Sequence, residues 1–203
     1  MTRRRTLLSL AAASALAACA RDVAPTHWYT LRADPPTPVS PAASASAATP
    51  AAGGDVWELS PAVRLPGALD RDTLLVESGS SGLQPLVGHR WAEPLRDSVP
   101  RLLLQDLQRL RGAGRVWAAP APPGVVVARK LTVEVLVLQA DAARRSLRMR
   151  ARWWFEDAAP AATPAAPQIG EADVAIEIAD GSVDALAAAH RLALWRLAGF
   201  VSR

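Results

Sequence analysis

The residue best suited to chemistry is Cys19, the only cysteine of this 203-residue chain. Its thiol follows three arginines at residues 3–5 and an apolar run over residues 7–18. A basic start, a short apolar stretch and small residues before a cleavage point are typical of a secretory signal peptide. The apolar run is too short for a membrane-spanning helix, which takes roughly 20 residues. Residues 1–18 are therefore predicted to be a signal peptide that is absent from the mature protein.

The segment Leu16-Ala17-Ala18-Cys19 resembles a bacterial lipobox, in which the cysteine sulfur carries lipid (such proteins also carry palmitate) and becomes the first mature residue. This likeness implies that residues 19–26 are a lipidated N-terminus and tether. Each buried acyl methylene contributes about 0.8 kcal/mol, so more than one chain gives stable anchoring. A plain signal peptide with a chance cysteine stays open as the alternative. In bacterial lipoproteins, an aspartate directly after the lipidated cysteine resembles an inner-membrane retention signal. This chain has Ala20 at that position, which favours the outer membrane.

No other group of residues has the spacing of a catalytic or metal site. The histidines His27, His89 and His190 fall in three different predicted elements, without the short spacing that metal ligands show. The Gly-Ser-Ser-Gly segment at residues 79–82 lacks the pattern of a nucleophile elbow or a phosphate loop and is predicted to be a hairpin turn. We therefore expect no enzyme, no metal and no cofactor, and an adaptor or assembly component instead.

The charge of the chain gives no support to nucleic-acid binding. The whole sequence holds 23 basic and 19 acidic residues, but removal of the three signal-peptide arginines leaves 20 against 19. A nucleic-acid-binding domain usually needs a basic face. The mature chain is nearly neutral, and we expect no nucleic-acid partner.

Hydrophobic periodicity predicts a strand-rich start, a helix, a three-stranded meander and a closing helix. Four strands are expected at residues 27–33, 56–65, 73–78 and 84–90, and a further short one at residues 116–117. Apolar residues at three- and four-residue steps predict helices over residues 93–111 and 183–201. The first of these stripes includes Leu110, and the second includes His190, which is expected to pack or cap. The Ala/Pro-rich segments 34–55 and 158–167 are predicted to be low-complexity loops.

The meander is expected at residues 131–139, 147–155 and 171–179. In its first strand, residues 131, 133, 135 and 137 are predicted to share one face, with Leu138 on the other. The middle strand places Arg148, Arg150, Arg152 and Trp154 together on the face opposite its apolar residues. Acidic residues of the neighbouring strands can pair with these arginines. Because arginine and aromatic residues are enriched at interfaces, an exposed Trp154 beside them also makes this face a candidate interface.

These elements predict a single domain of the α/β or α+β class, with a mixed β-sheet packed by two amphipathic helices. The periodicity does not separate the two classes. The domain is expected to span residues 27–203.

Three short motifs, in this order behind the lipobox, resemble the PqiC-type ABC transport auxiliary lipoprotein family. Trp28-Tyr29-Thr30-Leu31 is similar to the family's YYxL start. Residues 65–71 resemble its LPxxLDR segment and residues 90–95 its RWAEPL helix entry. The residues that carry these two likenesses, with an expected structural role, are Leu65, Pro66, Leu69, Asp70, Arg71, Arg90, Trp91 and Leu95.

The resemblance implies a lipoprotein that faces the periplasm of a Gram-negative bacterium, anchored in the outer membrane. It implies MCE-domain (mammalian cell entry) and ABC or permease partners, in a system that moves lipid between membranes and supports outer-membrane integrity. It also implies a homo-oligomeric ring. The alternative is a lipid-binding carrier or outer-membrane assembly lipoprotein with an apolar pocket of its own.

Overall fold

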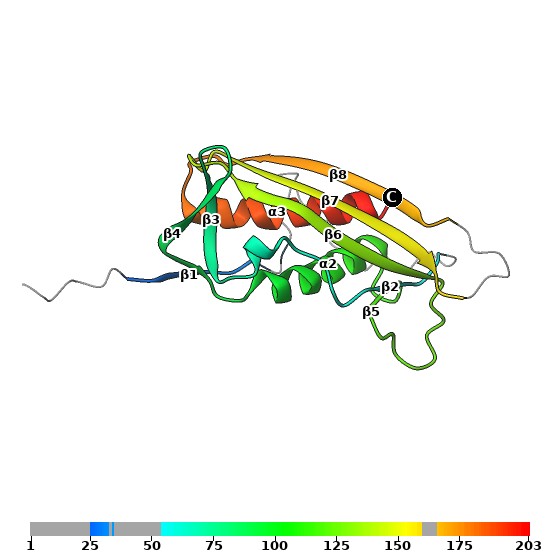
Figure 1. The fold of residues 1–203 in the computed structure, drawn as a ribbon. Coiled ribbons are helices and arrows are strands. Elements are labelled where there is room, and N and C mark those ends of the chain that lie inside the picture. The colour runs from blue at the N-terminus through cyan, green and yellow to red at the C-terminus, as the bar shows by residue number, and fades with distance from the viewer. Residues whose placement is uncertain (1–24, 33, 35–53, 160–165) are drawn as a thin grey trace, which may run out of the picture.

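The computed structural model describes residues 25–32, 34, 54–159 and 166–203 (Figure 1). Cys19, the predicted signal peptide and most of the predicted loops 34–55 and 158–167 lie outside these residues. Within them the chain forms one mixed, open sheet with two α-helices and a short 3-10 helix. The elements are β1 His27–Tyr29, β2 Trp57–Leu59, η1 Gly67–Leu69, β3 Thr73–Ser78, β4 Gly82–Trp91, α2 Leu95–Arg111, β5 Val116–Ala118, β6 Arg129–Ala140, β7 Ser146–Asp157, β8 Gln168–Glu177 and α3 Val183–Val201.

The predicted meander is the backbone of the sheet. β6, β7 and β8 pair antiparallel along nearly their whole lengths. The other edge of β6 is shared: β2 pairs parallel with its start, and Val76 of β3 pairs with Ala140 at its end. β2 pairs parallel with β5, β3 forms a hairpin with β4, and β4 pairs parallel with β1. The β3–β4 turn confirms the hairpin predicted for residues 79–82.

The helices α2 and α3 lie side by side, and α3 packs against β7 and β8 on one face of the meander (Figure 1). The β7 side chains at alternate positions from Leu147 to Phe155 point into this interface and are buried, while those between them are not. On α3, every residue of the predicted apolar stripe, His190 included, is buried. Ser182 caps α3 by accepting a hydrogen bond from the backbone N–H of Ala185. The predicted fold class, a mixed sheet packed by two helices, is confirmed.

Two details of the predicted packing are wrong. A bulge between Val135 and Val137 of β6 turns Leu138 toward the core and leaves Leu136 outside, because the extra residue of a bulge shifts the alternation of every residue after it. Leu110, predicted on the buried stripe of α2, is 41 % exposed in the last turn of the helix, where it borders a surface groove. The first strand also ends at Tyr29, before the predicted residue 33.

Candidate functional site

The arginine-bearing face of β7 forms as predicted, on the side of the sheet away from the helices. Arg148 forms a bidentate pair with Asp173 of β8, with Nε–Oδ1 and Nη2–Oδ2 distances of 3.1 and 2.5 Å. Arg152 donates from Nε to Glu134 of β6 at 2.6 Å. The hydrogen bond from Arg148 holds the pKa of Asp173 below its ordinary value. On this face, acidic residues of the neighbouring strands therefore pair with two of the arginines, as the sequence predicted.

Trp154 closes this face at one end and is half-buried rather than freely exposed. Its indole N–H donates to Glu156 at 3.2 Å, and the guanidinium of Arg64 lies 5.8 Å from the ring centroid. A cation at this distance over an indole ring is favourably placed. Arg64 lies beside this face because its backbone forms an isolated parallel β-bridge with Glu134 of β6. Trp154 thus lies beside arginines of its own strand and beside Arg64, and both residue types are enriched at protein interfaces.

The two family-like motifs meet at the entry to α2 through the contact of Asp70 with Arg96. Leu69 and Leu95 are buried in the core, and Leu65 packs against it from a half-buried position. Asp70 accepts a hydrogen bond from Arg96 in the first turn of α2 at 2.6 Å, and Arg90 pairs with Asp72 at 2.5 Å. Pro66 precedes η1, and Arg71 is exposed beside it.

Trp91 links this entry to α3. It is 3 % exposed and packs edge-on against His190, with ring centroids 5.2 Å apart. The Nδ1 atom of His190 lies 2.8 Å from the carbonyl oxygen of Leu186. Burial lowers the pKa of His190 to about 4, so this ring is neutral at physiological pH. His190 is a packed core residue, and the other two histidines, His27 and His89, stack on each other near the edge of the sheet.

The strongest polar feature was not singled out in the sequence: a buried ion pair between the two helices. Asp106 of α2 and Arg191 of α3 are 0 % and 3 % exposed and form two hydrogen bonds of 2.6 and 2.7 Å. Arg109 lies 3.5 Å from the same carboxylate. Burial raises the pKa of Asp106, while Arg191 and Arg109 oppose that rise. The sequence does contain a signal for this pair. Asp106 and Arg191 each occupy a position on the apolar face of their helix, where an apolar side chain is expected.

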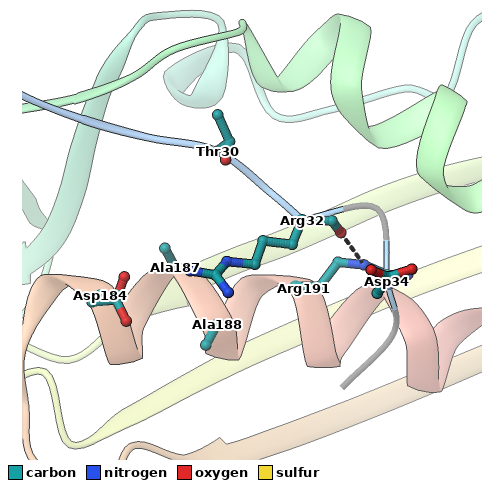
Figure 2. A pocket seen from close by; sticks show the side chains of 7 residues that line it. All are labelled: Thr30, Arg32, Asp34, Asp184, Ala187, Ala188 and Arg191. Atoms are coloured by element: carbon teal, nitrogen blue, oxygen red, sulfur yellow. Dashed lines mark hydrogen bonds between the residues drawn. The ribbon is translucent and has the colours of Figure 1, made fainter. Parts of the chain in front are cut away.

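Arg191 also holds the segment that follows β1. Its Nε donates to the carbonyl oxygen of Arg32 at 2.8 Å, as Figure 2 shows. Beside this contact lies a cavity of about 210 Å³ between the segment and α3. Its lining is mixed in charge: Thr30, Arg32, Asp34, Asp184, Ala187, Ala188 and Arg191 (Figure 2). Carboxylates and guanidiniums offset one another here, so the cavity selects for neither sign of charge.

Within the part of the chain that the structure describes, no three histidine, cysteine or carboxylate side chains are grouped as metal ligands. No helix of that part is long and apolar enough to cross a bilayer.

Comparison with known proteins agrees with the fold. Residues 29–202 match the family model described as "ABC-type transport auxiliary lipoprotein component". The crystal structure of protein XCC0632 from Xanthomonas campestris, of the family DUF330, superposes with a TM-score of 0.59 at 17 % identity, over 85 % of this chain and 90 % of that one. The crystal structure of an uncharacterized protein gives a TM-score of 0.61 at 13 % identity, over 73 % of this chain and 90 % of that one. At these identities the structures show a shared fold alone. No curated protein matches the sequence.

Proposed function

The chain belongs to the family of ABC-type transport auxiliary lipoprotein components, and we propose that it is the lipid-anchored periplasmic component of an MCE/ABC-type system. In this proposal Cys19 carries the lipid, the outer membrane is the site of anchoring, and the system moves lipid between membranes and supports outer-membrane integrity. The observation that carries the proposal is the family match over residues 29–202, which spans every strand and helix except the first residues of β1.

The domain acts by contact rather than by catalysis in this proposal. The residues with the strongest polar geometry serve the fold: Asp106 and Arg191 join the two helices, and Asp70 and Asp72 fix the entry to α2. Among the described residues the most buried titratable ring, His190, packs on Trp91. Such groups stabilise a rigid scaffold, and a rigid scaffold suits a docking module.

The face of β7 that bears Arg148, Arg150, Arg152 and Trp154 is the surface we propose for the MCE-domain partner or for the next subunit of a ring. Its salt bridges are exposed, so their charges remain available to a partner, and each contributes little to the stability of the free domain. Desolvation by a partner strengthens such pairs and fixes the register of docking.

Photocrosslinking in cells tests this proposal on the full chain. A photoreactive residue replaces Arg150, at the centre of the face, and the matched control replaces Val126, which is 86 % exposed in the loop before β6. We expect an adduct with an MCE-domain protein, or with a second copy of the chain, from position 150 and none from position 126. Absence of any MCE-domain adduct from all exposed positions of β7 contradicts the proposed partner.

The alternative, a carrier with a deep apolar pocket between sheet and helices, has less support. The fully buried side chains of Leu147, Met149 and Leu194 fill the interface between β7 and α3. An acyl chain can enter there only if these side chains move, which a close-packed core resists.

A further inference from the structure

A shallow apolar groove lies at the far end of the two helices, away from the face of β7 and from the cavity beside Arg32. It has a volume of about 400 Å³ and is lined by Leu110, Trp195, Arg196, Gly199, Phe200 and Arg203. Leu110 comes from the end of α2 and the other residues from the end of α3 and the residues just after it. Figure 1 shows these two helix ends at the same end of the molecule, beside the sheet. Two large apolar side chains, Leu110 and Phe200, are 41 % and 40 % exposed in it.

The floor of the groove is bare helix backbone at Gly199. A Cβ at this position would meet no heavy atom of the described residues within 4 Å, apart from the backbone of its own helix, so none of these residues requires a glycine there. Glycine within a helix costs about 0.5–1 kcal/mol relative to alanine. The groove is therefore open down to the helix backbone at Gly199, and a ligand can approach the backbone there without meeting a side chain.

The charged side chains that line the groove are of one sign. Arg196 and Arg203 flank the apolar floor, and no carboxylate side chain lines it. Among the described residues neither arginine takes part in a salt bridge, although the same part of the structure contains ten such contacts. Arg196 donates to the carbonyl oxygen of Ala175, and the Arg203 guanidinium lies 5.5 Å from the ring of Phe200. Both guanidiniums keep donors for an anion.

We propose that this groove binds one anionic lipid, with an acyl chain along Gly199 between Leu110 and Phe200 and the headgroup phosphate at Arg196 and Arg203. The lining of the groove offers hydrocarbon and guanidinium groups, which match the acyl chain and the phosphate of such a lipid. A volume of about 400 Å³ suits a small amphiphile and lies within the usual range of ligand pockets.

The groove continues toward β8, which lengthens the path available to an acyl chain. Phe200 and Arg203 also line an adjoining hollow of about 180 Å³. Its other walls include Trp153 and Ile169, and Ile169 is 64 % exposed at the start of β8. The ligand proposal deepens the proposed transport role, but it stands on the groove and is tested apart from the docking of an MCE partner.

Photolabelling tests the proposal on the full lipid-anchored chain in nanodiscs. The probe is phosphatidylglycerol with a diazirine in its acyl chain, and labelled peptides are mapped by mass spectrometry. We expect labelling to concentrate in residues 195–203. Gly199→Leu fills the groove and lowers this labelling about tenfold, because the leucine displaces two or more acyl methylenes. The matched control is Gly114→Leu, at another glycine with open space around it and outside the groove, which leaves the labelling unchanged.

A second arm tests the headgroup. In the wild-type chain we expect the phosphatidylglycerol probe to label several-fold more than the same probe with a phosphatidylcholine headgroup. Arg196→Gln with Arg203→Gln removes that preference. Inorganic phosphate at millimolar concentration does not compete, because the acyl chain supplies most of the binding. Labelling spread evenly over the surface, labelling unaffected by Gly199→Leu, or full competition by phosphate alone overturns the lipid site. None of these results depends on the protein adducts that test the proposed partner.

Discussion

Replacement of Arg191 by methionine tests whether the buried ion pair holds the helices together. The change removes two hydrogen bonds to Asp106 and one to the carbonyl oxygen of Arg32, and it leaves a carboxylate that is 0 % exposed. Breaking a buried pair at one partner typically costs about 3–5 kcal/mol. Arg109, 3.5 Å from the same carboxylate, compensates in part, so we expect a loss of about 3 kcal/mol at pH 7, at the lower end of this range. That is a large fraction of the total stability of a domain.

The pH dependence of this loss separates the explanation from a simple packing defect. Burial raises the pKa of Asp106, and removal of Arg191 raises it further. A carboxyl group with a raised folded-state pKa binds its proton more tightly in the folded chain, so its destabilising effect is greatest well above that pKa and shrinks as the pH falls. We therefore expect the gap between wild type and variant to narrow from pH 7 toward pH 4. A packing defect leaves the gap constant.

Urea unfolding followed by tryptophan fluorescence measures both quantities. Arg196→Met is the matched control, since it makes the same replacement on the exposed side of α3 and is expected to change the free energy of unfolding by less than about 0.5 kcal/mol. The double variant Asp106→Leu with Arg191→Met is expected to recover most of the lost stability, because no charge is left buried. A loss below about 1 kcal/mol for Arg191→Met, or a gap that widens toward pH 4, refutes the reasoning.

Three further predictions follow from the anchor, the buried histidine and two glycines. Cys19→Ala is expected to release the chain from membranes during cell fractionation and to leave its thermal unfolding unchanged; retention on membranes contradicts anchoring through this residue. His190, with a pKa lowered to about 4, must be charged in the unfolded chain below pH 6.5, so stability should fall by about 3 kcal/mol from pH 6.5 to 4, and His190→Leu should flatten that part of the urea-unfolding profile. Gly170→Ala places a Cβ 2.4 Å from the indole of Trp153 and is expected to destabilise by about 1–3 kcal/mol, whereas Gly199→Ala, in open space, should stabilise by about 0.5–1 kcal/mol; equal effects in calorimetry argue against both assignments.

The sequence predicts the elements better than their pairing. β7 and α3 alternate cleanly in hydrophobicity, so their buried faces follow from the pattern alone. β6 does not: Leu136, Val137 and Leu138 are all apolar, so no period reveals the bulge that turns Leu138 inward. The parallel pairings of β1 with β4 and of β2 with β5 are equally hidden, because they depend on the path of the whole chain rather than on any local signal.

The candidate site was likewise predictable from the sequence only in part. The charge pairing of the arginine-bearing face could be predicted, because cross-strand neighbours follow once a meander is assumed. Asp106 and Arg191 are 85 residues apart in the sequence. Each interrupts the apolar stripe of its helix, but nothing in the sequence near either residue indicates that the two pair. The groove around Gly199 combines the ends of two helices, and its open floor is visible only when both are placed.

The contact between Arg191 and the carbonyl oxygen of Arg32 also has a mechanical meaning. The chain that comes from Cys19 enters the domain at β1, which has only three residues and lies parallel to β4. Tension from the N-terminal side therefore loads the β1–β4 hydrogen bonds in shear, all together, rather than opening them one at a time. Just after β1, the hydrogen bond from Arg191 to the carbonyl oxygen of Arg32 connects the same segment to the ion pair between α2 and α3. A pull on the chain before β1 is thus resisted at two places, the pairing of β1 with β4 and the contact of Arg191 with the segment after β1.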